Sequence, residues 1–276
     1  MQFAHTPPVA LTIAGSDPSG GAGLQADLKT FHRHGVYGAT VVTLLTVQNT
    51  RTVSGIEFVA PAFVESQWDA VVSDIPPHAV KTGALGRADI IAAVAARLRA
   101  SRAPVVVDPV MVTKHGVPIL ADDAVEVLAR ELLPCAHVVT PNMAEASRLS
   151  GIEVRCAQSM ERAARAIAAL GPRHVLVKGG HLREGALDLL WSDGQAHVFA
   201  AERIDSTSTH GTGCTLSAAI TARLARGESV RDAVAGARAF VRSAIAGAPR
   251  LGGGVGPIDH FAAVEALEPS GGGDGR

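Results

Sequence analysis

A short segment of small and polar residues, Thr209–Cys214, has the composition of an anion-binding turn. It reads Thr-His-Gly-Thr-Gly-Cys and precedes a helix predicted over residues 215–226. Successive backbone N–H groups of such a turn can hold the charge that develops on a phosphoryl group during transfer. Gly211, Gly213 and Cys214 are therefore candidates for a phosphotransfer site. The alternative is a glycine turn beside an inert, buried cysteine.

Cys214 could also take part in the chemistry. The dipole of the predicted helix would lower the pKa of its thiol. A thiol of that kind could act as the base that accepts the proton of a substrate hydroxyl, or stand near that base. The position of this cysteine, rather than its residue type, supports the hypothesis.

Polar residues also follow the ends of three other strand-like runs. Asp108 comes directly after Val105–Val107, Asn142 and Glu145 follow the run that ends at Thr140, and Lys178 ends another run. Oxygen ligands of this kind suit Mg²⁺, and a lysine can neutralise the charge of a donor phosphate. The structural alternatives are a helix cap for Asp108 or Asn142 and an ordinary charged surface for the other two.

The loop Gly15–Gly23 follows the first predicted strand and leads into a helix that carries Asp27. Its glycines allow the backbone to approach a ligand, and the start of the helix favours an anion or a polar group. Its spacing is neither GxGxxG nor a Walker motif, which disfavours a dinucleotide-dependent oxidoreductase. The alternative to a ligand site is a tight turn that needs glycine.

The elements that would position these residues alternate between β-branched runs and amphipathic helices. Strands are predicted at Val9–Ala14, Tyr37–Leu45, Ala79–Lys81, Val105–Asp108, His137–Thr140 and Val175–Lys178. Nearly continuous apolar strands imply burial on both faces, as in a three-layer α/β/α sandwich with a mainly parallel central sheet. Ligands bind beyond the carboxyl ends of the strands in such sheets, where the polar residues stand.

Two helical stretches, Ile90–Leu98 and Leu216–Leu224, carry apolar residues at helical spacing and are each expected to bury one stripe. The arginines expected to face away from the core are Arg97, Arg99, Arg223 and Arg226. Thr52–Phe58 and Leu187–Ala200 are expected to add hairpins or edge strands. We predict one domain over residues 9–265, with a flexible N-terminus at 1–8 and a flexible Gly-rich tail at 266–276.

Composition narrows the class of protein. The 276 residues carry a formal net charge of -1 with 47% hydrophobic residues, so neither nucleic acid nor an acidic membrane is an expected partner. Three cysteines without CxxC pairing indicate a reducing compartment. No signal peptide or membrane-spanning segment is predicted, so we expect a cytoplasmic protein.

Seven ordered motifs together resemble the bacterial hydroxymethylpyrimidine/phosphomethylpyrimidine kinases of thiamine biosynthesis, within the ribokinase superfamily. The motifs are Gly15–Gly23, Thr46–Thr50, Lys81–Gly83, Asp108–Met111, Thr140–Asn142, Val177–His181 and His210–Cys214. The resemblance covers roughly Val9 to Phe261. It implies a ribokinase-like fold, dependence on ATP and Mg²⁺, a homodimer, and two successive phosphorylations of 4-amino-5-hydroxymethyl-2-methylpyrimidine.

The resemblance also implies roles for individual residues. Gln48 would pair its amide with the ring nitrogen and the exocyclic amine of the pyrimidine, since an amide offers both a donor and an acceptor. Gly15, Asp27 and Val110 would contribute to the pyrimidine pocket, with Asp27 accepting a substrate hydrogen bond. Met111–Gly116 resembles the family's mobile flap, in which Lys114 could close over the site.

The same resemblance implies that the anion hole consists of Gly211, Gly213 and Cys214, that Lys178 touches the donor, and that Asp108, Asn142 and Glu145 organise Mg²⁺ or its waters. Most members of the superfamily have Asp where this chain has Cys214. Ala84 stands where the family often has Met, and Thr46 where Val is common; both adjoin the expected pyrimidine contacts.

Other functions remain open on the sequence. A vitamin B6 kinase of the same superfamily would also act on a hydroxymethyl group of a six-membered nitrogen ring. A non-catalytic pyrimidine-binding protein could keep the fold without phosphoryl transfer. The joint placement of the polar residues at strand ends argues against this second alternative.

Overall fold

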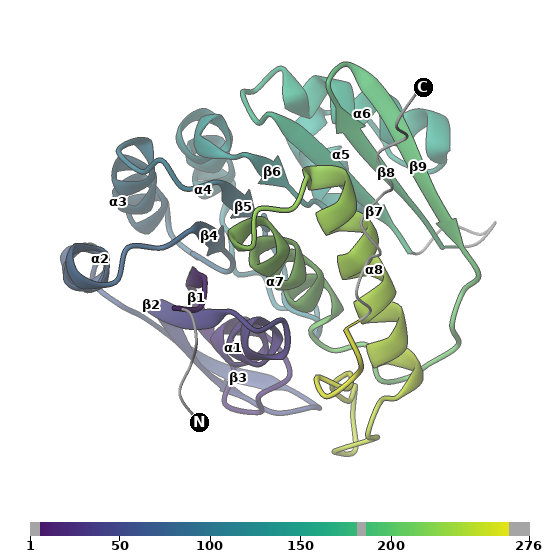
Figure 1. Ribbon diagram of the computed structural model, residues 1–276, viewed down its shortest axis with the longest axis horizontal. Coiled ribbons are helices and arrows are strands. Elements are labelled where there is room, and N and C mark those ends of the chain that lie inside the picture. Colours follow the sequence, from purple (N-terminus) through teal and green to yellow (C-terminus); the bar gives the residue numbers. More distant parts are fainter. Residues whose placement is uncertain (1–5, 181–185, 265–276) are drawn as a thin grey trace, which may run out of the picture.

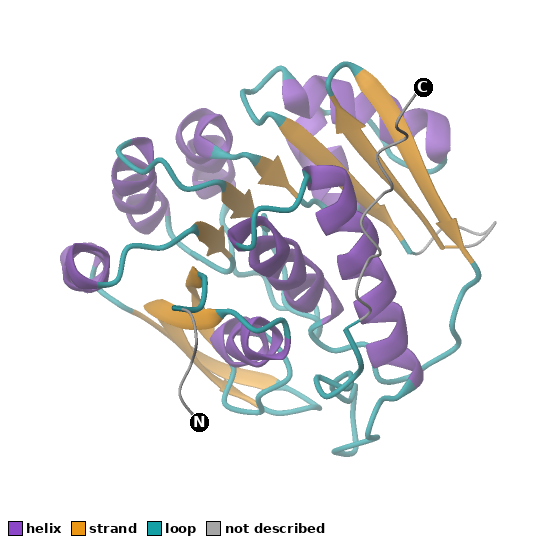
Figure 2. Cartoon of the chain, in the orientation of Figure 1, coloured by secondary structure: helices purple, strands orange, loops and turns teal. Residues whose placement is uncertain are grey.

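Hydrophobic β-branched runs form the strands of one nine-stranded sheet in the computed structural model, which describes residues 6–180 and 186–264 (Figures 1 and 2). The strand order is β3-β2-β1-β4-β5-β6-β7-β8-β9. The bounds are β1 (Val9–Ser16), β2 (Tyr37–Gln48), β3 (Val53–Phe58), β4 (Ala79–Thr82), β5 (Val105–Val107), β6 (Val138–Val139), β7 (His174–Gly179), β8 (Ala186–Ser192) and β9 (Gln195–Ala201). The six central strands, in the order β2-β1-β4-β5-β6-β7, pair in parallel, which confirms the predicted sheet type.

Helices cover both faces of the sheet, so the predicted three-layer sandwich is confirmed (Figure 1). One face carries α1 (Gly23–Arg33), α7 (Thr212–Ala225) and α8 (Val230–Ala246). The other carries α2 (Pro61–Asp74), α3 (Ala88–Arg99), α4 (Asp122–Val127), α5 (Met143–Ser150) and α6 (Ala157–Ala168), and a π turn (Leu128–Leu132) and a 3₁₀ turn (Leu133–Cys135) continue α4.

The sequence of the short strand β5 is apolar throughout because both faces of the strand are buried. Val105 and Val107 belong to the hydrophobic core on one face of the sheet, and Val106 belongs to the core on the other. The helix α3 buries one stripe that includes Ile90, Ile91, Val94 and Leu98, as its periodicity predicts. Both expectations rest on local pattern alone, and the structure confirms both.

The predictions for α7 were wrong in two respects. The helix starts at Thr212, so Gly213 and Cys214 lie in its first turn rather than before it. It also buries every residue from Thr215 to Ala225, because it lies between the sheet, α1 and α8. Arg223 is only 2% exposed and does not face away from the core.

Arg223 is accommodated inside this layer by a local arrangement. Its Nε lies 2.8 Å from a carboxylate oxygen of Glu228, and Gly236 of α8 leaves room for the guanidinium group. A Cβ on Gly236 would overlap that group. The arginine is therefore compatible with burial because it has a charged partner and a glycine opposite.

The added edge strands agree with prediction. β3 pairs antiparallel with β2, and β8 and β9 form an antiparallel hairpin beside β7. Asp193 and Gly194 at the hairpin turn both have positive φ, as a two-residue turn of this kind requires. β2 extends to Gln48, which places that side chain at the end of a strand.

The predicted tail at 266–276 and residues 1–5 of the predicted N-terminal segment lie outside the described residues. The boundaries of the single predicted domain stay a prediction, although β1 does begin at Val9. Within residues 6–180 and 186–264, no helix is long and apolar enough to cross a membrane.

Candidate active site

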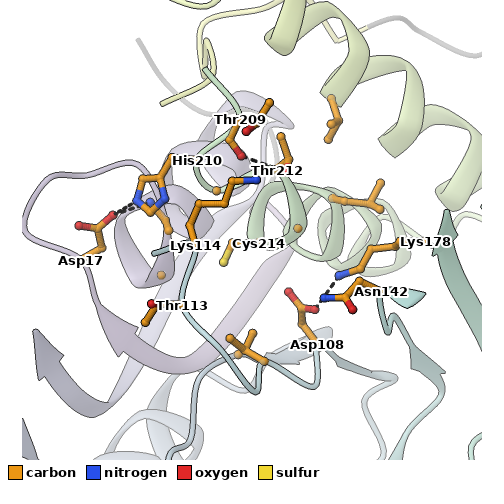
Figure 3. A pocket seen from close by; sticks show the side chains of 18 of the residues that line it. Asp17, Asp108, Thr113, Lys114, Asn142, Lys178, Thr209, His210, Thr212 and Cys214 are labelled. Carbon is orange, nitrogen blue, oxygen red and sulfur yellow. Dashed lines mark hydrogen bonds and ion pairs between the residues drawn. The ribbon is translucent and has the colours of Figure 1, made fainter. Parts of the chain in front are cut away.

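The carboxyl ends of the parallel strands open into a cavity of about 650 Å³ (Figure 3). All the site residues predicted from the sequence line this cavity except Asp27. The lining residues among them are Gly15, Thr46, Gln48, Ala84, Asp108, Val110, Lys114, Asn142, Glu145, Lys178, Gly211, Gly213 and Cys214. The fold thus gathers residues from seven separate segments, as the strand-end argument requires.

The start of α7 forms one wall of the cavity. Gly211 has φ of 80°, and a Cβ there would overlap the carbonyl oxygen of Gly21 in the first loop. The two glycine-rich segments therefore pack backbone against backbone. The N–H groups of the first helical turn have no carbonyl partner within the helix, so those of Gly213 and Cys214 are available to an anion.

Lys178 and Asp108 face this wall. A Cβ on Gly213 would lie 3.3 Å from Lys178 Nζ and 3.8 Å from Asp108 Oδ2, so the absence of a side chain leaves space between helix and lysine. Lys178 Nζ donates to Asp108 Oδ1 at 3.0 Å, and Ser217 donates to Oδ2 at 3.1 Å. The lysine is mostly buried and is not the surface charge of the structural alternative.

Charges decide the ionisation of this pair. Burial acts to raise the pKa of Asp108, but the nearby Lys178 and Lys81 outweigh it and lower that pKa. Burial likewise acts to lower the pKa of Lys178, and Asp108 reverses the direction. Asp108 is therefore a carboxylate and Lys178 an ammonium group at neutral pH, which suits a site for phosphate and a cation.

Asn142 and Glu145 form a capping box at the start of α5. The Asn142 side chain accepts from the Glu145 backbone N–H at 2.9 Å, and Glu145 Oε2 accepts from the Asn142 N–H at 2.7 Å. The helix-cap alternative is thus correct for Asn142, although its side chain also lines the cavity. Glu145 is buried rather than solvated, and burial raises its pKa to about 7.

The carboxylates that line the cavity fit a metal ion that takes most of its ligands from water and phosphate. Among the described residues, no group of three or more His, Cys, Asp or Glu side chains is placed to hold a metal ion. Mg²⁺ commonly uses one or two carboxylates and takes its remaining ligands from water and phosphate. Asp108 and Glu145, both facing the cavity, meet that more modest requirement.

The predicted pyrimidine contacts line another part of the cavity. Gln48 and Thr46 project from the end of β2, and Gly15 lies at the end of β1, where a Cβ would come within 2.5 Å of Leu44 Cδ1. Ala84 and Val110 also line the cavity. These residues lie together as the resemblance implied, and their contact with a substrate stays a prediction.

The structure does not support the prediction that Asp27 accepts a substrate hydrogen bond. Its side chain is fully buried on α1, where Asp27 Oδ2 accepts from Lys81 Nζ at 2.9 Å and from Thr12 Oγ1 at 2.6 Å. The carboxylate is thus committed to an ion pair beneath the cavity floor. Lys81 itself lines the cavity, and Asp27 is placed to hold it.

The prediction of a lowered thiol pKa was also wrong. Burial raises the pKa of Cys214 to about 11, and the carboxylates of Asp108 and Asp27 add to this effect against the opposing charge of Lys81. Desolvation at this position outweighs the helix dipole. Cys214 is therefore a neutral thiol at physiological pH and is poorly suited to act as a base.

The segment that carries Lys114 folds over the cavity. Val112 and Pro118 form an antiparallel bridge, and His115 Nε2 lies 3.0 Å from the carbonyl oxygen of Thr50. Lys114 and Thr113 line the cavity, and Figure 3 shows the Lys114 side chain extending toward Thr209 and Thr212 at the start of α7. This position agrees with the expected flap; its movement stays a prediction.

Sequence reasoning assigned no role to two residues that interact inside the site. His210 Nε2 lies 2.7 Å from Asp17 Oδ2, and both side chains are nearly fully buried (Figure 3). Both residues belong to motifs noted above, but they are 193 positions apart. Their chemistry was visible in the sequence, and their contact depends on the packing of the first loop against α7.

Comparison with known proteins identifies close relatives. The family model for phosphomethylpyrimidine kinase matches residues 17–259. A hydroxymethylpyrimidine/phosphomethylpyrimidine kinase from Streptomyces coelicolor is 48% identical over 255 residues, which cover 92% of this chain and 95% of the relative. A thiamine biosynthesis bifunctional protein from Geobacter sulfurreducens is 51% identical over 257 residues, and the matched part is only 52% of its length.

Solved structures agree with the predicted ribokinase-like fold. A phosphomethylpyrimidine kinase from Clostridium difficile matches with a TM-score of 0.78 and 41% identity, over 86% of this chain and 99% of that one. A Staphylococcus aureus pyridoxal kinase in complex with AMP-PCP and pyridoxal matches with a TM-score of 0.87 and 39% identity, over 94% and 95% of the two chains. On the family match and the shared fold, this chain is a kinase that belongs to the phosphomethylpyrimidine kinase family.

Proposed function

We propose that this chain transfers the γ-phosphoryl group of ATP to the hydroxymethyl oxygen of 4-amino-5-hydroxymethyl-2-methylpyrimidine and then adds a second phosphoryl group. The observation that carries the proposal is a single cavity lined by both the Gln48 amide and the start of α7. Relatives named hydroxymethylpyrimidine/phosphomethylpyrimidine kinase support this reaction, and the thiamine biosynthesis bifunctional protein supports a role in thiamine biosynthesis.

Recognition of the pyrimidine would rest on Gln48. Its amide offers one donor and one acceptor to the ring nitrogen and the exocyclic amine. Gly15, Ala84 and Val110 would shape the space around the ring, and the small side chain of Ala84 leaves more room than a methionine. A ring that leaves the hydrogen bonds of this half-buried amide unmade would bind less well, so Gln48 would set the specificity.

Phosphoryl transfer would occur at the start of α7. The backbone N–H groups of Gly213 and Cys214, held by the turn at Gly211, would bind the charge of the transferring group. Lys178 would neutralise the donor phosphates, and Lys114 on the flap would help to exclude water. Transition states of phosphoryl transfer are mostly loose, so positioning and charge stabilisation suffice without a strong base.

Asp108, Glu145 and Asn142 would hold Mg²⁺ or its bound waters beside Lys178. A Mg²⁺ ion bound together with ATP would neutralise charge on the phosphate oxygens. Binding of a cation near Glu145 would favour its ionised form, because the pKa near 7 reflects a buried carboxyl without enough positive charge.

The wider assignment is a cytoplasmic homodimer that binds ATP and a small aminopyrimidine, with no nucleic-acid or membrane partner. Three apolar side chains of β2, the neighbour of the edge strand β3, are exposed: Tyr37, Leu45 and Val47, of which Val47 is 65% exposed. Exposed apolar side chains of this kind support an interface between two copies of the chain. The balanced net charge supports the exclusion of polyanions.

A pyridoxal kinase is the second candidate. Solved structures of pyridoxal kinase from Staphylococcus aureus match this chain with TM-scores of 0.86 to 0.87 at 39 to 40% identity. Pyridoxal also presents a hydroxymethyl group on a nitrogen ring. Pyridoxal has no amine on the carbon next to its ring nitrogen. The Gln48 amide would therefore make both of its hydrogen bonds only to the aminopyrimidine and would favour it.

A mass-resolved assay with Mg-ATP tests both candidates. Purified protein is given the hydroxymethylpyrimidine or pyridoxal, and the mass of each product is measured. Two successive additions of one phosphate to the pyrimidine are expected. A single addition confined to pyridoxal would reassign the pocket to vitamin B6, and no transfer to either compound would contradict the proposed function.

A further inference from the structure

The side-chain amide of Gln48 lies between two polar neighbours inside the cavity. The atom placed as its nitrogen lies 3.2 Å from His210 Nε2, and the atom placed as its oxygen lies 3.3 Å from Thr46 Oγ1. An amide oxygen and an amide nitrogen have nearly the same shape, so packing does not decide which atom faces which neighbour. The hydrogen bonds that the neighbours make elsewhere do decide it.

On one side, the contact with Asp17 makes His210 Nε2 a hydrogen-bond donor. Asp17 Oδ1 accepts from the N–H and the hydroxyl of Ser19, and Oδ2 accepts from the Ala22 N–H at 2.9 Å. With three donors pointed at it, Asp17 is an ionised acceptor. His210 Nε2, 2.7 Å from Oδ2, must then carry a hydrogen and donate it to Asp17. This holds for both the neutral and the charged ring.

An Nε2 that carries a hydrogen has no lone pair in the ring plane. It cannot accept a hydrogen bond from an NH₂ group of Gln48. If the amide nitrogen faced His210, two donors would therefore oppose each other at 3.2 Å, with the histidine buried and the amide half-buried. The amide oxygen in that position would instead share the hydrogen that His210 directs to Asp17.

On the other side, Ser16 determines the orientation of the Thr46 hydroxyl. Thr46 Oγ1 lies 2.9 Å from the carbonyl oxygen of Ser16, which can only accept. The single hydroxyl hydrogen is therefore donated to Ser16, and lone pairs of Thr46 face Gln48. An amide nitrogen is the atom that can donate to those lone pairs, whereas an amide oxygen would be repelled.

Both neighbours select the same orientation. We propose that they fix the Gln48 amide with its oxygen toward His210 and its nitrogen toward Thr46. Thr46 and His210 are thus positioning residues for Gln48, and Asp17 acts through His210. One amide hydrogen and one oxygen lone pair stay free for a ligand in the cavity.

The orientation has a consequence for the substrate, and this step rests on the proposed function. The exocyclic amine must face the amide oxygen, on the His210 side, and the ring nitrogen must face the amide nitrogen, on the Thr46 side. The carbon that bears the amine has two ring neighbours. One is the paired ring nitrogen, and the other is the carbon that carries the hydroxymethyl group. The hydroxymethyl group therefore lies on the His210 side of the ring, and Gly211–Cys214, the expected anion hole, follows His210 in the chain and lines the same cavity. The opposite amide orientation would turn it away.

Neutron diffraction on the deuterated, ligand-free protein tests the orientation without a substrate. Deuterium is expected on His210 Nε2 and on the Gln48 amide atom that faces Thr46. An ND₂ group that faces His210 would overturn the proposal. This result does not depend on what the enzyme phosphorylates.

A substrate comparison tests the consequence. The 4-oxo analogue of the pyrimidine has an N–H and a carbonyl in place of the ring nitrogen and the amine, so it needs the reversed amide. Wild-type protein should prefer the 4-amino compound in kcat/KM. Thr46→Val removes one of the two constraints, and the preference should fall about three- to tenfold, as expected for one neutral hydrogen bond.

Two further variants separate positioning from general damage. Thr46→Ser keeps the hydroxyl and should retain the wild-type preference within about twofold. Thr43→Val removes a similar hydroxyl on the same strand, one that donates to the Ala84 carbonyl and does not touch Gln48, and should leave the preference unchanged. An unchanged preference in Thr46→Val would overturn the proposal, whereas failure of wild-type protein to phosphorylate either pyrimidine would contradict the proposed function alone.

Discussion

Replacing Gly213 with alanine should separate catalysis from folding. Gly213 lies in the first turn of α7, and its φ is not in the left-handed region, so alanine can adopt the same backbone. Alanine is favoured over glycine in helices by up to about 1 kcal/mol. The variant should therefore be as stable as the wild-type protein or slightly more stable.

The added methyl group would occupy the space that the phosphoryl group needs. It would lie 3.3 Å from Lys178 Nζ and 3.8 Å from Asp108 Oδ2, between the N–H groups of the helix start and the charges opposite. The alanine variant keeps its backbone N–H, but the methyl group would hold the phosphoryl group away from it. The cost should then resemble the loss of one anion-hole donor, which reduces kcat by about 10²- to 10³-fold, or about 3 to 4 kcal/mol of transition-state stabilisation. We expect a loss of that size in kcat/KM.

The assay pairs steady-state kinetics with urea unfolding. Gly211→Ala is the comparison, because its Cβ would overlap the Gly21 carbonyl oxygen and should lower both stability and activity. A Gly213→Ala protein that keeps activity within about threefold of wild type would refute the assignment of the anion hole. Loss of stability in that variant would refute the reasoning about its backbone.

Two other predictions follow from the altered pKa values. Cys214→Ser should retain kcat within about tenfold, with an unchanged pH profile between about pH 6 and 9, because a thiol of pKa about 11 is not the base; a loss above about a hundredfold, typical of a missing general base, would contradict this. The second concerns Glu145, whose pKa rises from 4.5 to about 7 on folding. The folded state favours its protonated form, and this contribution to stability is lost as pH rises through 7. Urea unfolding should show that the free energy of unfolding of wild-type protein falls by up to about 3 kcal/mol relative to that of Glu145→Gln between about pH 4.5 and 7.5. The same dependence of unfolding free energy on pH in both proteins would contradict this. Glutamine keeps the capping box in that comparison.

Much of the site could be predicted because its signals are local. The run Val105–Val107 predicts a strand buried on both faces, and Asp108 directly after it must then stand at the ligand-binding edge of the sheet. The glycines of Gly211–Gly213 likewise mark a turn into a helix. Patterns of this kind depend only on residues a few positions apart, so the sequence states them directly.

Burial and pairing across long separations were decided only by the tertiary structure. Arg223 has the spacing of a solvent-facing residue, yet α7 is enclosed on all sides and Gly236 makes room for it. Asp27 has the position of a ligand-binding acid, yet Lys81, 54 residues away, takes its carboxylate. Each outcome depends on which distant element packs opposite.

The pKa of Cys214 illustrates the same division. Its place at a helix start is written in the sequence and predicts a lowered pKa, whereas desolvation among buried carboxylates raises it to about 11. The sequence alone thus determined the strands, the turns and the chemical groups available at the sheet edge. The tertiary structure alone decided which groups are ionised and paired, because desolvation and Coulomb interactions depend on distances in space rather than along the chain.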